Sequence, residues 1–228
     1  MNTLDEIRRA IERLSRGERT ELEVWIREVA SVQDGVSEPR SSYGAARKAR
    51  LLSVDEYLKF EEMSTTRHEY VGGEVFAMTG ATTRHNVICL NVAFALAAHV
   101  RGGPCRAYVE AVKVRLTVKG EEIFYYPDVS VACGPQDLDK VFVTDPKLIV
   151  EVLSPSTERT DRGEKALNYR EIPTLEEYVL IDQRKPEVTL CRRSDDWRPQ
   201  VLTRPDAEAQ LRSVAFTLPL GRIYDGAL

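Results

Sequence analysis

Two acidic residues interrupt apolar stretches of the sequence in a way that points to metal chemistry. Glu151 lies inside the run Leu148 to Leu153, whose other members are all apolar. Asp128 follows Pro127 and precedes the mostly apolar residues 129–133. A buried carboxylate is costly unless it is paired, hydrogen-bonded or bound to a metal. We therefore expect both side chains to serve one site inside the fold.

The spacing of the two acids allows them to meet. They are 23 residues apart, which is room for one strand, a connection and a second strand. Neighbouring strands can bring both carboxylates to one end or face of a sheet. Together with the backbone carbonyl of Val152, the side chains of Asp128 and Glu151 would offer the oxygen ligands that Mg²⁺, or Mn²⁺ in its place, prefers. The sequence thus predicts a divalent cation site that neutralises the pair.

A hydrolase for phosphodiesters also needs a group that orients or activates water and positive charge for the developing oxyanion. Lys165 fits this role. It lies on a predicted helix over residues 162–171, in one stripe with Asp161 and Tyr169 at i−4 and i+4. The alternative is that Lys165 only pairs with Asp161 or Glu164 on a solvated helix face.

Two further residues are weaker candidates for the catalytic group. His85, at the start of a predicted helix, could touch phosphate or act as an acid, although a capping or packing role explains it equally well. Glu74 follows the pair Gly72 and Gly73 and could add a carboxylate to the metal or its waters, or be an exposed hairpin residue.

Bulk composition narrows the class of protein. The chain has 228 residues, of which 43% are hydrophobic and 30% charged, with a net charge of −4. This excludes wholesale disorder and a global basic field, so a polyanionic partner must meet a local patch. The four cysteines show no zinc-ligand spacing, and we expect them to be reduced. Without an apolar leader or a stretch of membrane-spanning length, we expect a cytoplasmic protein that does not enter membranes.

Periodicity divides the chain into three parts. Residues 1–32 carry two helical apolar stripes and predict an N-terminal helical hairpin, residues 33–50 read as a linker, and the main domain is expected over residues 51–228. In the main domain, helices and strands interleave without regular alternation, which predicts a mixed α+β (α/β) sheet flanked by helices. Strands are expected at 67–78 (a hairpin), 107–118, 127–133, 148–153, 178–182, 187–192 and 199–203, and helices at 54–58, 85–100 and 162–171.

The stretches that carry these residues resemble a known family. They are RHEYVGGEVFAMTGATTRHN, YYPDVSV, LIVEVLSPST with DRGEKALNYR, and EEYVLID. They resemble the Uma-type family of restriction endonucleases within the PD-(D/E)XK nuclease superfamily, over roughly residues 51–224. The resemblance implies a restriction-endonuclease-like fold, Asp128 and Glu151 as metal ligands, and Mg²⁺-dependent cleavage of nucleic acid.

One position departs from the superfamily pattern. A lysine is expected two residues after the second acid, where this chain has Leu153. In the Uma-type pattern a lysine on the following helix is usual, which favours migration of the lysine to Lys165 over its loss. We therefore expect a metal-dependent endonuclease that prefers DNA and acts as a homodimer. The alternatives are an RNA-cleaving enzyme and an inactive nucleic-acid-binding or assembly module on a nuclease fold.

Overall fold

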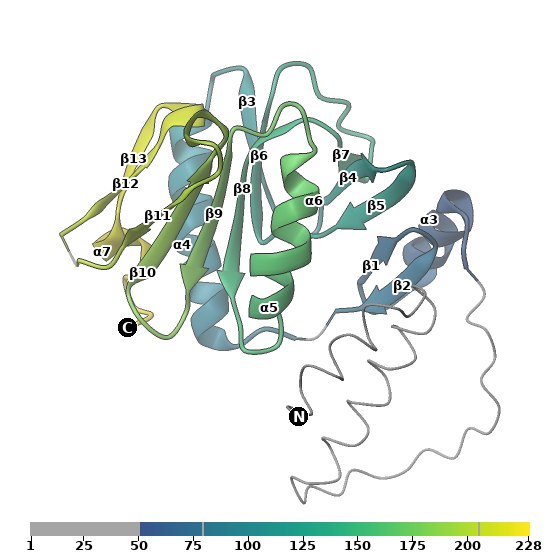
Figure 1. Cartoon of the computed structure of the whole chain (residues 1–228), viewed down its shortest axis with the longest axis horizontal. Helices are drawn as coiled ribbons and strands as arrows, with labels where there is room; N and C mark the ends of the chain where they lie inside the picture. Colours follow the sequence, from purple (N-terminus) through teal and green to yellow (C-terminus); the bar gives the residue numbers. More distant parts are fainter. Residues whose placement is uncertain (1–50, 79, 205) are drawn as a thin grey trace, which may run out of the picture. The chain divides into compact units, whose positions relative to one another are not determined.

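A computed structural model of the protein describes residues 51–78, 80–204 and 206–228, which belong to one compact unit (Figure 1). The predicted hairpin 1–32 and linker 33–50 lie outside the described residues. Among the helices of the described part, none has the length and apolar character needed to cross a membrane.

The described part begins with a short helix and a hairpin. Helix α3 (Val54–Met63) starts at Ser53, whose hydroxyl accepts the N–H of Glu56 while the Glu56 carboxylate accepts the N–H of Ser53. Strands β1 (His68–Val71) and β2 (Glu74–Ala77) follow, joined at Gly72 and Gly73, which have φ of +56° and +103°. This turn between β1 and β2 confirms the predicted hairpin. Its positive φ values explain why glycine occupies both positions.

The remaining strands form two larger sheets and a separate hairpin. One sheet has the order β2-β1-β5-β4-β7, the other β11-β10-β9-β8-β6-β3, and β12 pairs with β13. In the second sheet β8 pairs antiparallel with β6 and parallel with β9, so the mixed α+β architecture is confirmed. The bounds are β3 Cys105–Val109, β4 Lys113–Val118, β5 Glu121–Tyr125, β6 Val129–Cys133, β7 Phe142–Val143, β8 Pro146–Leu153, β9 Glu177–Asp182, β10 Glu187–Arg192, β11 Pro199–Leu202, β12 Glu208–Leu211 and β13 Phe216–Pro219.

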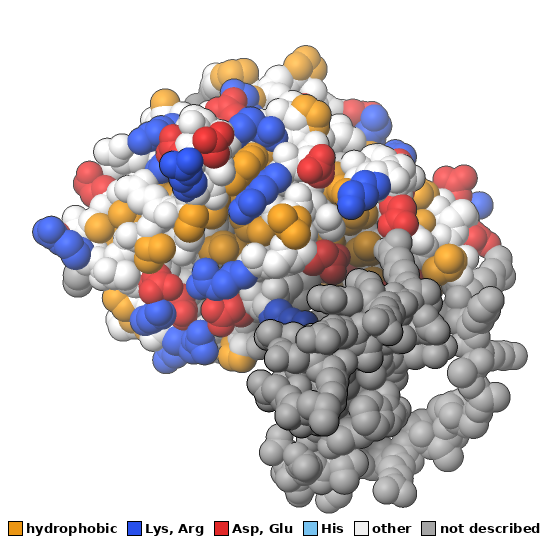
Figure 2. All heavy atoms as spheres, viewed as in Figure 1, with side chains coloured by type: hydrophobic (Ala, Val, Ile, Leu, Met, Phe, Trp, Pro, Cys, Tyr) orange, Lys and Arg blue, Asp and Glu red, His pale blue; other side chains and the backbone are white. Residues whose placement is uncertain are grey.

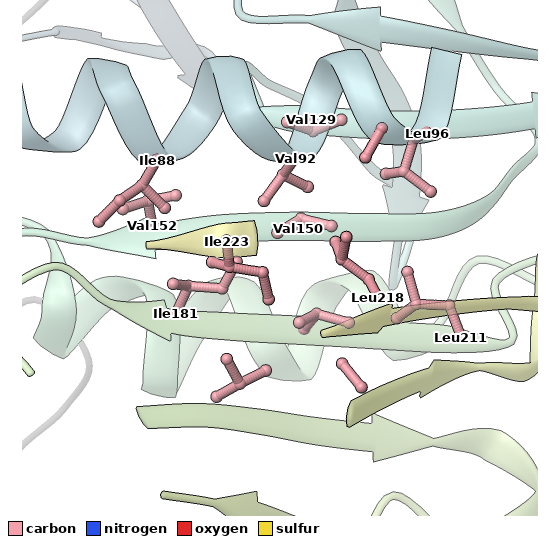
Figure 3. Close-up of a cluster of buried hydrophobic side chains, with 14 of the residues drawn as sticks. Ile88, Val92, Leu96, Val129, Val150, Val152, Ile181, Leu211, Leu218 and Ile223 are labelled. Carbon is pink, nitrogen blue, oxygen red and sulfur yellow. The ribbon is translucent and has the colours of Figure 1, made fainter. Parts of the chain in front are cut away.

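Helices cover both faces of the six-stranded sheet. On one face, Ile88, Val92 and Leu96 of α4 (Thr83–Val100) pack against Val150 and Val152 of β8 (Figure 3). On the other face lies a continuous helical segment made of α5 (Glu158–Thr160), a π-helical turn (Asp161–Lys165) and α6 (Ala166–Arg170). Short elements complete the fold, namely α7 (Leu220–Ile223) and 3-10 turns at Arg193–Asp195 and Arg212–Val214.

Several expected boundaries are wrong. The expected strand 107–118 is two strands, β3 and β4, which belong to different sheets and are separated by Glu110 with φ of +36°. Strands β5, β7, β12 and β13 are not predicted by the sequence pattern. The helix expected to begin at residue 162 begins at Glu158 and contains the π-helical turn.

The expectation of four reduced cysteines is wrong for one pair. Cys105 and Cys133 form a disulfide, whereas Cys89 and Cys191 are free and buried. The cause is the strand register, since Cys105 lies directly opposite Cys133 in the antiparallel pair of β3 and β6. Residues 28 positions apart in sequence thereby become neighbours, which their spacing alone did not indicate.

Candidate active site

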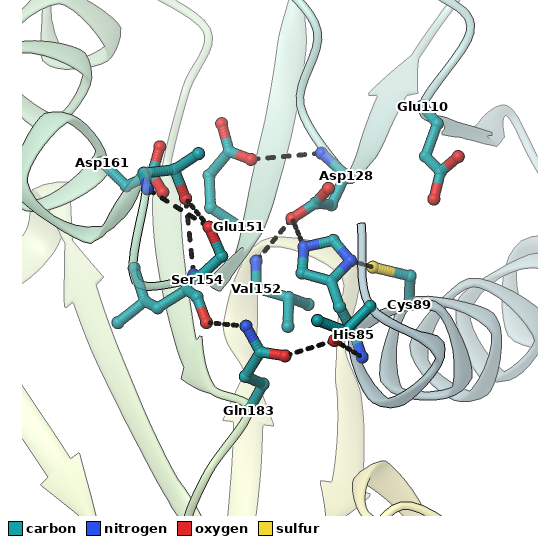
Figure 4. A network of polar contacts seen from close by, with 12 residues as sticks. His85, Cys89, Glu110, Asp128, Glu151, Val152, Ser154, Asp161 and Gln183 are labelled. Atoms are coloured by element: carbon teal, nitrogen blue, oxygen red, sulfur yellow. Dashed lines mark hydrogen bonds and ion pairs between the residues drawn. The ribbon is translucent and has the colours of Figure 1, made fainter. Parts of the chain in front are cut away.

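The acids Asp128 and Glu151 lie opposite each other at the end of the β6–β8 ladder. Val129 pairs with Val150, so Asp128 and Glu151 occupy the next position of the same antiparallel register. The Asp128 N–H donates to Glu151 Oε2 at 3.2 Å, and the Val152 N–H donates to Asp128 Oδ2 at 2.6 Å (Figure 4). Each carboxylate thus accepts a backbone hydrogen bond from the other strand.

Glu151 points to the face of the sheet that carries α6. Its neighbours Ile149 and Leu153 on the same side of β8 belong to the apolar cluster that includes Ala166 and Tyr169. The Tyr169 hydroxyl donates to Glu151 Oε1 at 3.2 Å. The alternation of side chains along β8 therefore places one carboxylate beneath the helix that carries Lys165.

Lys165 lies at the centre of three carboxylates. Its Nζ is 2.9 Å from Glu69 Oε1, 3.4 Å from Glu151 Oε1 and 3.4 Å from Asp161 Oδ1. The Lys165 side chain is 7% exposed. Its alternative placement on a solvated helix face is therefore wrong, and helix spacing explains why Asp161 and Lys165 meet on one side.

The cluster carries more negative than positive charge. Glu69, Glu151 and Asp161 contact one ammonium, and Asp128 lies beside Glu151. With all four acids ionised, the surplus is three negative charges, or two when His85 is protonated. Burial raises the pKa of Glu151 well above its usual range, in spite of the Lys165 ammonium, and burial also raises the pKa of Asp161. Burial lowers the pKa of Lys165, but the three carboxylates outweigh it and the net pKa is raised. One lysine thus does not balance these acids.

His85 joins the cluster from the opposite face of the sheet. Its Nε2 is 3.3 Å from Asp128 Oδ2, and its Nδ1 is 3.4 Å from Cys89 Sγ. Burial lowers the pKa of His85, but the hydrogen bond with Asp128 and the charge of the Asp128 carboxylate raise this pKa by more, so the net pKa is raised. The sequence prediction of His85 near the site agrees with this placement.

His85, Cys89 and Asp128 place ligand atoms within 4.8 Å of one another. The thiol and the carboxylate contact different nitrogens of the imidazole, which is the geometry of a hydrogen-bonded chain through the ring. Burial also raises the pKa of the Cys89 thiol, so it stays protonated. Of these three residues, Asp128 is the one suited to a hard cation.

A cavity of about 430 Å³ opens onto the cluster. Asp128, Asp161, Lys165 and His85 line its floor, and Arg67, Glu110 and the segment Ser154 to Thr157 form part of its rim. Within the segment, the Ser154 hydroxyl forms hydrogen bonds with the hydroxyls of Ser156 and Thr157. The cavity gives a small substrate group access to otherwise buried charges.

Glu74 is exposed, and among residues 51–78, 80–204 and 206–228 no hydrogen bond or ion pair links it to the cluster. The carboxylate that reaches Lys165 from this hairpin is Glu69, which the sequence analysis missed. Both acids lie on one face of the hairpin, because Glu69 pairs with Phe76 and Val71 pairs with Glu74. However, β1 is the inner strand beside β5, whereas β2 is the edge strand. The strand order, which sequence does not give, separates the two residues.

This difference gives a paired test. Glu69→Gln should lower any catalytic rate by about 10- to 100-fold, because Lys165 loses one of the carboxylates that hold it in place. Glu74→Gln, on the neighbouring strand, should leave the rate within about two-fold because exposed side chains away from a site contribute little. Initial rates of both variants, with circular dichroism to confirm folding, would measure this. Equal losses in the two variants would contradict the assignment.

Comparisons with known proteins agree with this architecture. Residues 54–221 match the Uma2 family, described as "putative restriction endonuclease". The chain is 35% identical over 177 residues to the "uncharacterized protein slr1290" of Synechocystis, covering 77% of this chain and 92% of that protein. It is 37% identical over 137 residues to "sll1609" of the same organism, covering 59% and 76%.

A crystal structure of a "putative nuclease belonging to DUF820" from Anabaena variabilis has the same fold. The TM-score is 0.64 at 21% sequence identity, with 78% of this chain and 99% of that chain covered. Since the family match spans most of the described residues, this chain belongs to the Uma2 family of restriction-endonuclease-like proteins.

Proposed function

We propose that this protein is a metal-dependent nuclease whose active site is the cluster around Lys165. The observation that carries the proposal is the excess of carboxylates over cations, since three carboxylates contact the one ammonium of Lys165, Asp128 lies beside them, and Asp128, Asp161 and Lys165 line a cavity. Uncompensated charges of this kind are costly in a fold and concentrate at functional sites. Membership in a family of restriction-endonuclease-like proteins supports the same reading.

The residues present fit a divalent cation. Asp161 Oδ1 is buried and has no hydrogen-bond partner among the described residues, although Lys165 Nζ lies 3.4 Å away. Asp128 and Glu151 would hold the ion, and the Val152 carbonyl faces the same side as its N–H, towards Asp128. These oxygens suit Mg²⁺ or Mn²⁺. When bound, such an ion supplies Lewis-acid activation of water and of a phosphoryl oxygen.

The side chains supply the remaining requirements of phosphodiester hydrolysis. Lys165, held by Glu69 and Asp161, would donate a hydrogen bond to the attacking water or to a non-bridging oxygen where negative charge develops. His85, held between Asp128 and Cys89, would hold the Asp128 carboxylate in its orientation. Fixing these donors before reaction is the main source of rate in such sites.

The proposed substrate is nucleic acid, with DNA preferred. On the face shown in Figure 2, blue and red side chains are interspersed, so contact with a polyanion depends on local groups of arginine and lysine. Purified protein incubated with plasmid, single-stranded DNA and RNA in Mg²⁺, Mn²⁺ or EDTA tests the proposal. Cleavage that needs the metal supports a nuclease. Faster cleavage of RNA than of DNA would show that RNA is the preferred substrate. Metal binding without any cleavage would favour the inactive binding module.

A divalent ion should stabilise the domain, more so at higher pH. The pKa values of Glu151 and His85 are raised above their ordinary 4.5 and 6.5. Groups with a raised folded pKa contribute stability below the unfolded pKa and lose it as pH rises through the folded pKa. The metal-free domain should therefore lose stability as the pH rises through the raised pKa values of Glu151 and His85. At that higher pH the carboxylates are ionised and free to bind an ion.

Thermal denaturation measures this effect. At a metal concentration about 100-fold above Kd, Tm should rise by about 5 to 10 °C, with a larger rise near about pH 8 than near about pH 6. Asp128→Asn is the matched variant, since it removes one proposed ligand and keeps the side-chain size. A shift of the same size in wild type and variant would contradict the assignment of the ligands.

We also propose a cytoplasmic homodimer. Helix α4 has no charged residue from Asn86 to Ala98, yet Leu90 and Phe94 are 59% and 74% exposed. Helices that are apolar all round are usually covered, and a second copy would cover this face. Light scattering should give twice the chain mass for wild type and the single mass for Phe94→Glu. The proposed cytoplasmic location requires that glutathione does not reduce the Cys105–Cys133 disulfide.

A further inference from the structure

A second cavity adjoins the one over the candidate active site. Its volume is about 530 Å³, and it shares Thr82 and Pro155 with the first cavity, so these two residues form the common wall. Arg84 and Arg184 line the second cavity. Arg184 is paired with Asp182 and Glu158, whereas Arg84 is exposed and has no ion pair among the residues that the structure describes.

The charged groups of the active site are recessed. The side chains of Glu151, Asp161 and Lys165 are 4%, 3% and 7% exposed, and that of Asp128 is 17% exposed. A phosphate must therefore enter the first cavity to reach them. A duplex is stiff, with a persistence length of about 50 nm, and carries its phosphates on a convex surface. A single strand can bend locally to insert one nucleotide.

The wall of the first cavity is partly apolar. Met78, Ala81, Tyr126 and Pro155 line it beside the charged floor. Tyr126 is only 4% exposed, its hydroxyl donates to Glu61 at 2.8 Å, and Lys113 Nζ lies 5.1 Å from its ring centroid, so this residue supports the wall and offers no open ring face. The apolar surface of the other three residues suits an unpaired base, whereas the bases of a duplex are stacked inside the helix. The first cavity thus offers charged and apolar surfaces next to each other, in a volume large enough for one nucleotide.

We propose that the two cavities bind a single-stranded nucleic acid, with one phosphate at the acidic floor, its base against Met78 and Ala81, and a neighbouring phosphate beside Arg84. The proposal rests on the proposed nuclease function and specifies the form of its substrate. The strand passes over Thr82 and Pro155 between the cavities. Single-stranded DNA, single-stranded RNA or an unpaired flap can each provide this chemistry.

Binding and cleavage of labelled oligonucleotides test the proposal. The full-length protein is mixed with single-stranded DNA, single-stranded RNA and duplex DNA of one sequence, with Ca²⁺ in place of Mg²⁺ for anisotropy and with Mg²⁺ or Mn²⁺ for cleavage. A single strand should bind about ten-fold more tightly than the duplex. Arg84→Gln should weaken that binding by about three- to ten-fold and reduce the salt slope by about 0.7.

Arg101→Gln is the matched control, because Arg101 is also exposed, follows the other end of α4 and lines neither cavity. It should leave binding unchanged. Equal or tighter binding of the duplex, or equal losses in both variants, would overturn the proposal and leave the nuclease function standing. Tight binding of single strands with no cleavage of any substrate would refute the nuclease function and leave only the binding of single strands by the two cavities.

Discussion

Replacing Lys165 by alanine should lower the rate of nucleic acid cleavage by about 10²- to 10⁴-fold, the range measured for loss of a catalytic proton donor or oxyanion-stabilising group. The ammonium is the one cation that contacts Glu69, Glu151 and Asp161 among the described residues. Its loss removes both a hydrogen-bond donor to the reacting groups and the one positive charge that partly offsets the carboxylates. The effect should fall on kcat more than on KM, because the donor is needed most in the transition state.

The same variant should also change the response to metal. Without an ammonium, the metal-free cluster holds four carboxylates and is destabilised, so a divalent ion should raise its Tm more than that of wild type. Lys147→Ala is a suitable control, since Lys147 forms a half-exposed ion pair with Glu176 away from the cluster. A folded Lys165→Ala protein that keeps the wild-type rate would remove Lys165 from the mechanism.

Replacing Arg192 by alanine should lower the free energy of unfolding by about 3–5 kcal/mol, as is typical when one partner of a buried ion pair is removed. The side chains of Arg192 and Glu177 are 3% and 2% exposed, and Nε donates to Glu177 Oε1 at 2.8 Å. Glu177 also accepts the backbone N–H groups of Arg212 and Ser213. The pair therefore ties the turn after β12 to the central sheet.

Urea denaturation would measure this loss. Arg204→Ala provides the control, because the Arg204–Asp206 pair is exposed and should contribute nothing measurable. A double variant, Glu177→Leu with Arg192→Met, should recover only part of the stability, because apolar side chains can replace the ion pair but the N–H groups of Arg212 and Ser213 lose their acceptor. No loss in Arg192→Ala would show that water replaces the guanidinium at little cost. The activity per folded molecule should stay unchanged.

The sequence was most informative where local patterns constrain the fold. An acid within an apolar strand is expected to be buried and to need a partner. Glu151 could therefore be placed on a central strand and matched with Asp128 from their spacing in the sequence. Helical periodicity likewise brought Lys165, Asp161 and Tyr169 onto one face, and the structure joins all three to Glu151 directly or through Lys165. Apart from the match of Asp128 with Glu151, which spans two successive long strands, these relations lie within one strand or one helix.

Relations that depend on the order of strands could not be obtained in this way. Glu69 and Glu74 are equivalent in local pattern, and only the placement of β1 beside β5 brings Glu69 to Lys165. The disulfide between Cys105 and Cys133 likewise follows from the register of β3 and β6. Such long-range pairings are set by packing of the whole domain, which propensity and periodicity do not encode.

Isothermal titration of Mn²⁺ into the metal-free, full-length protein tests most directly whether the acidic cluster is a cation site. Wild type should bind the ion with saturable heat, and Asp128→Asn and Glu151→Gln should each weaken binding by about 10- to 100-fold or more, while Glu74→Gln should bind as wild type does. Absence of binding to wild type, or equal binding by the Asp128 and Glu151 variants, would contradict the account.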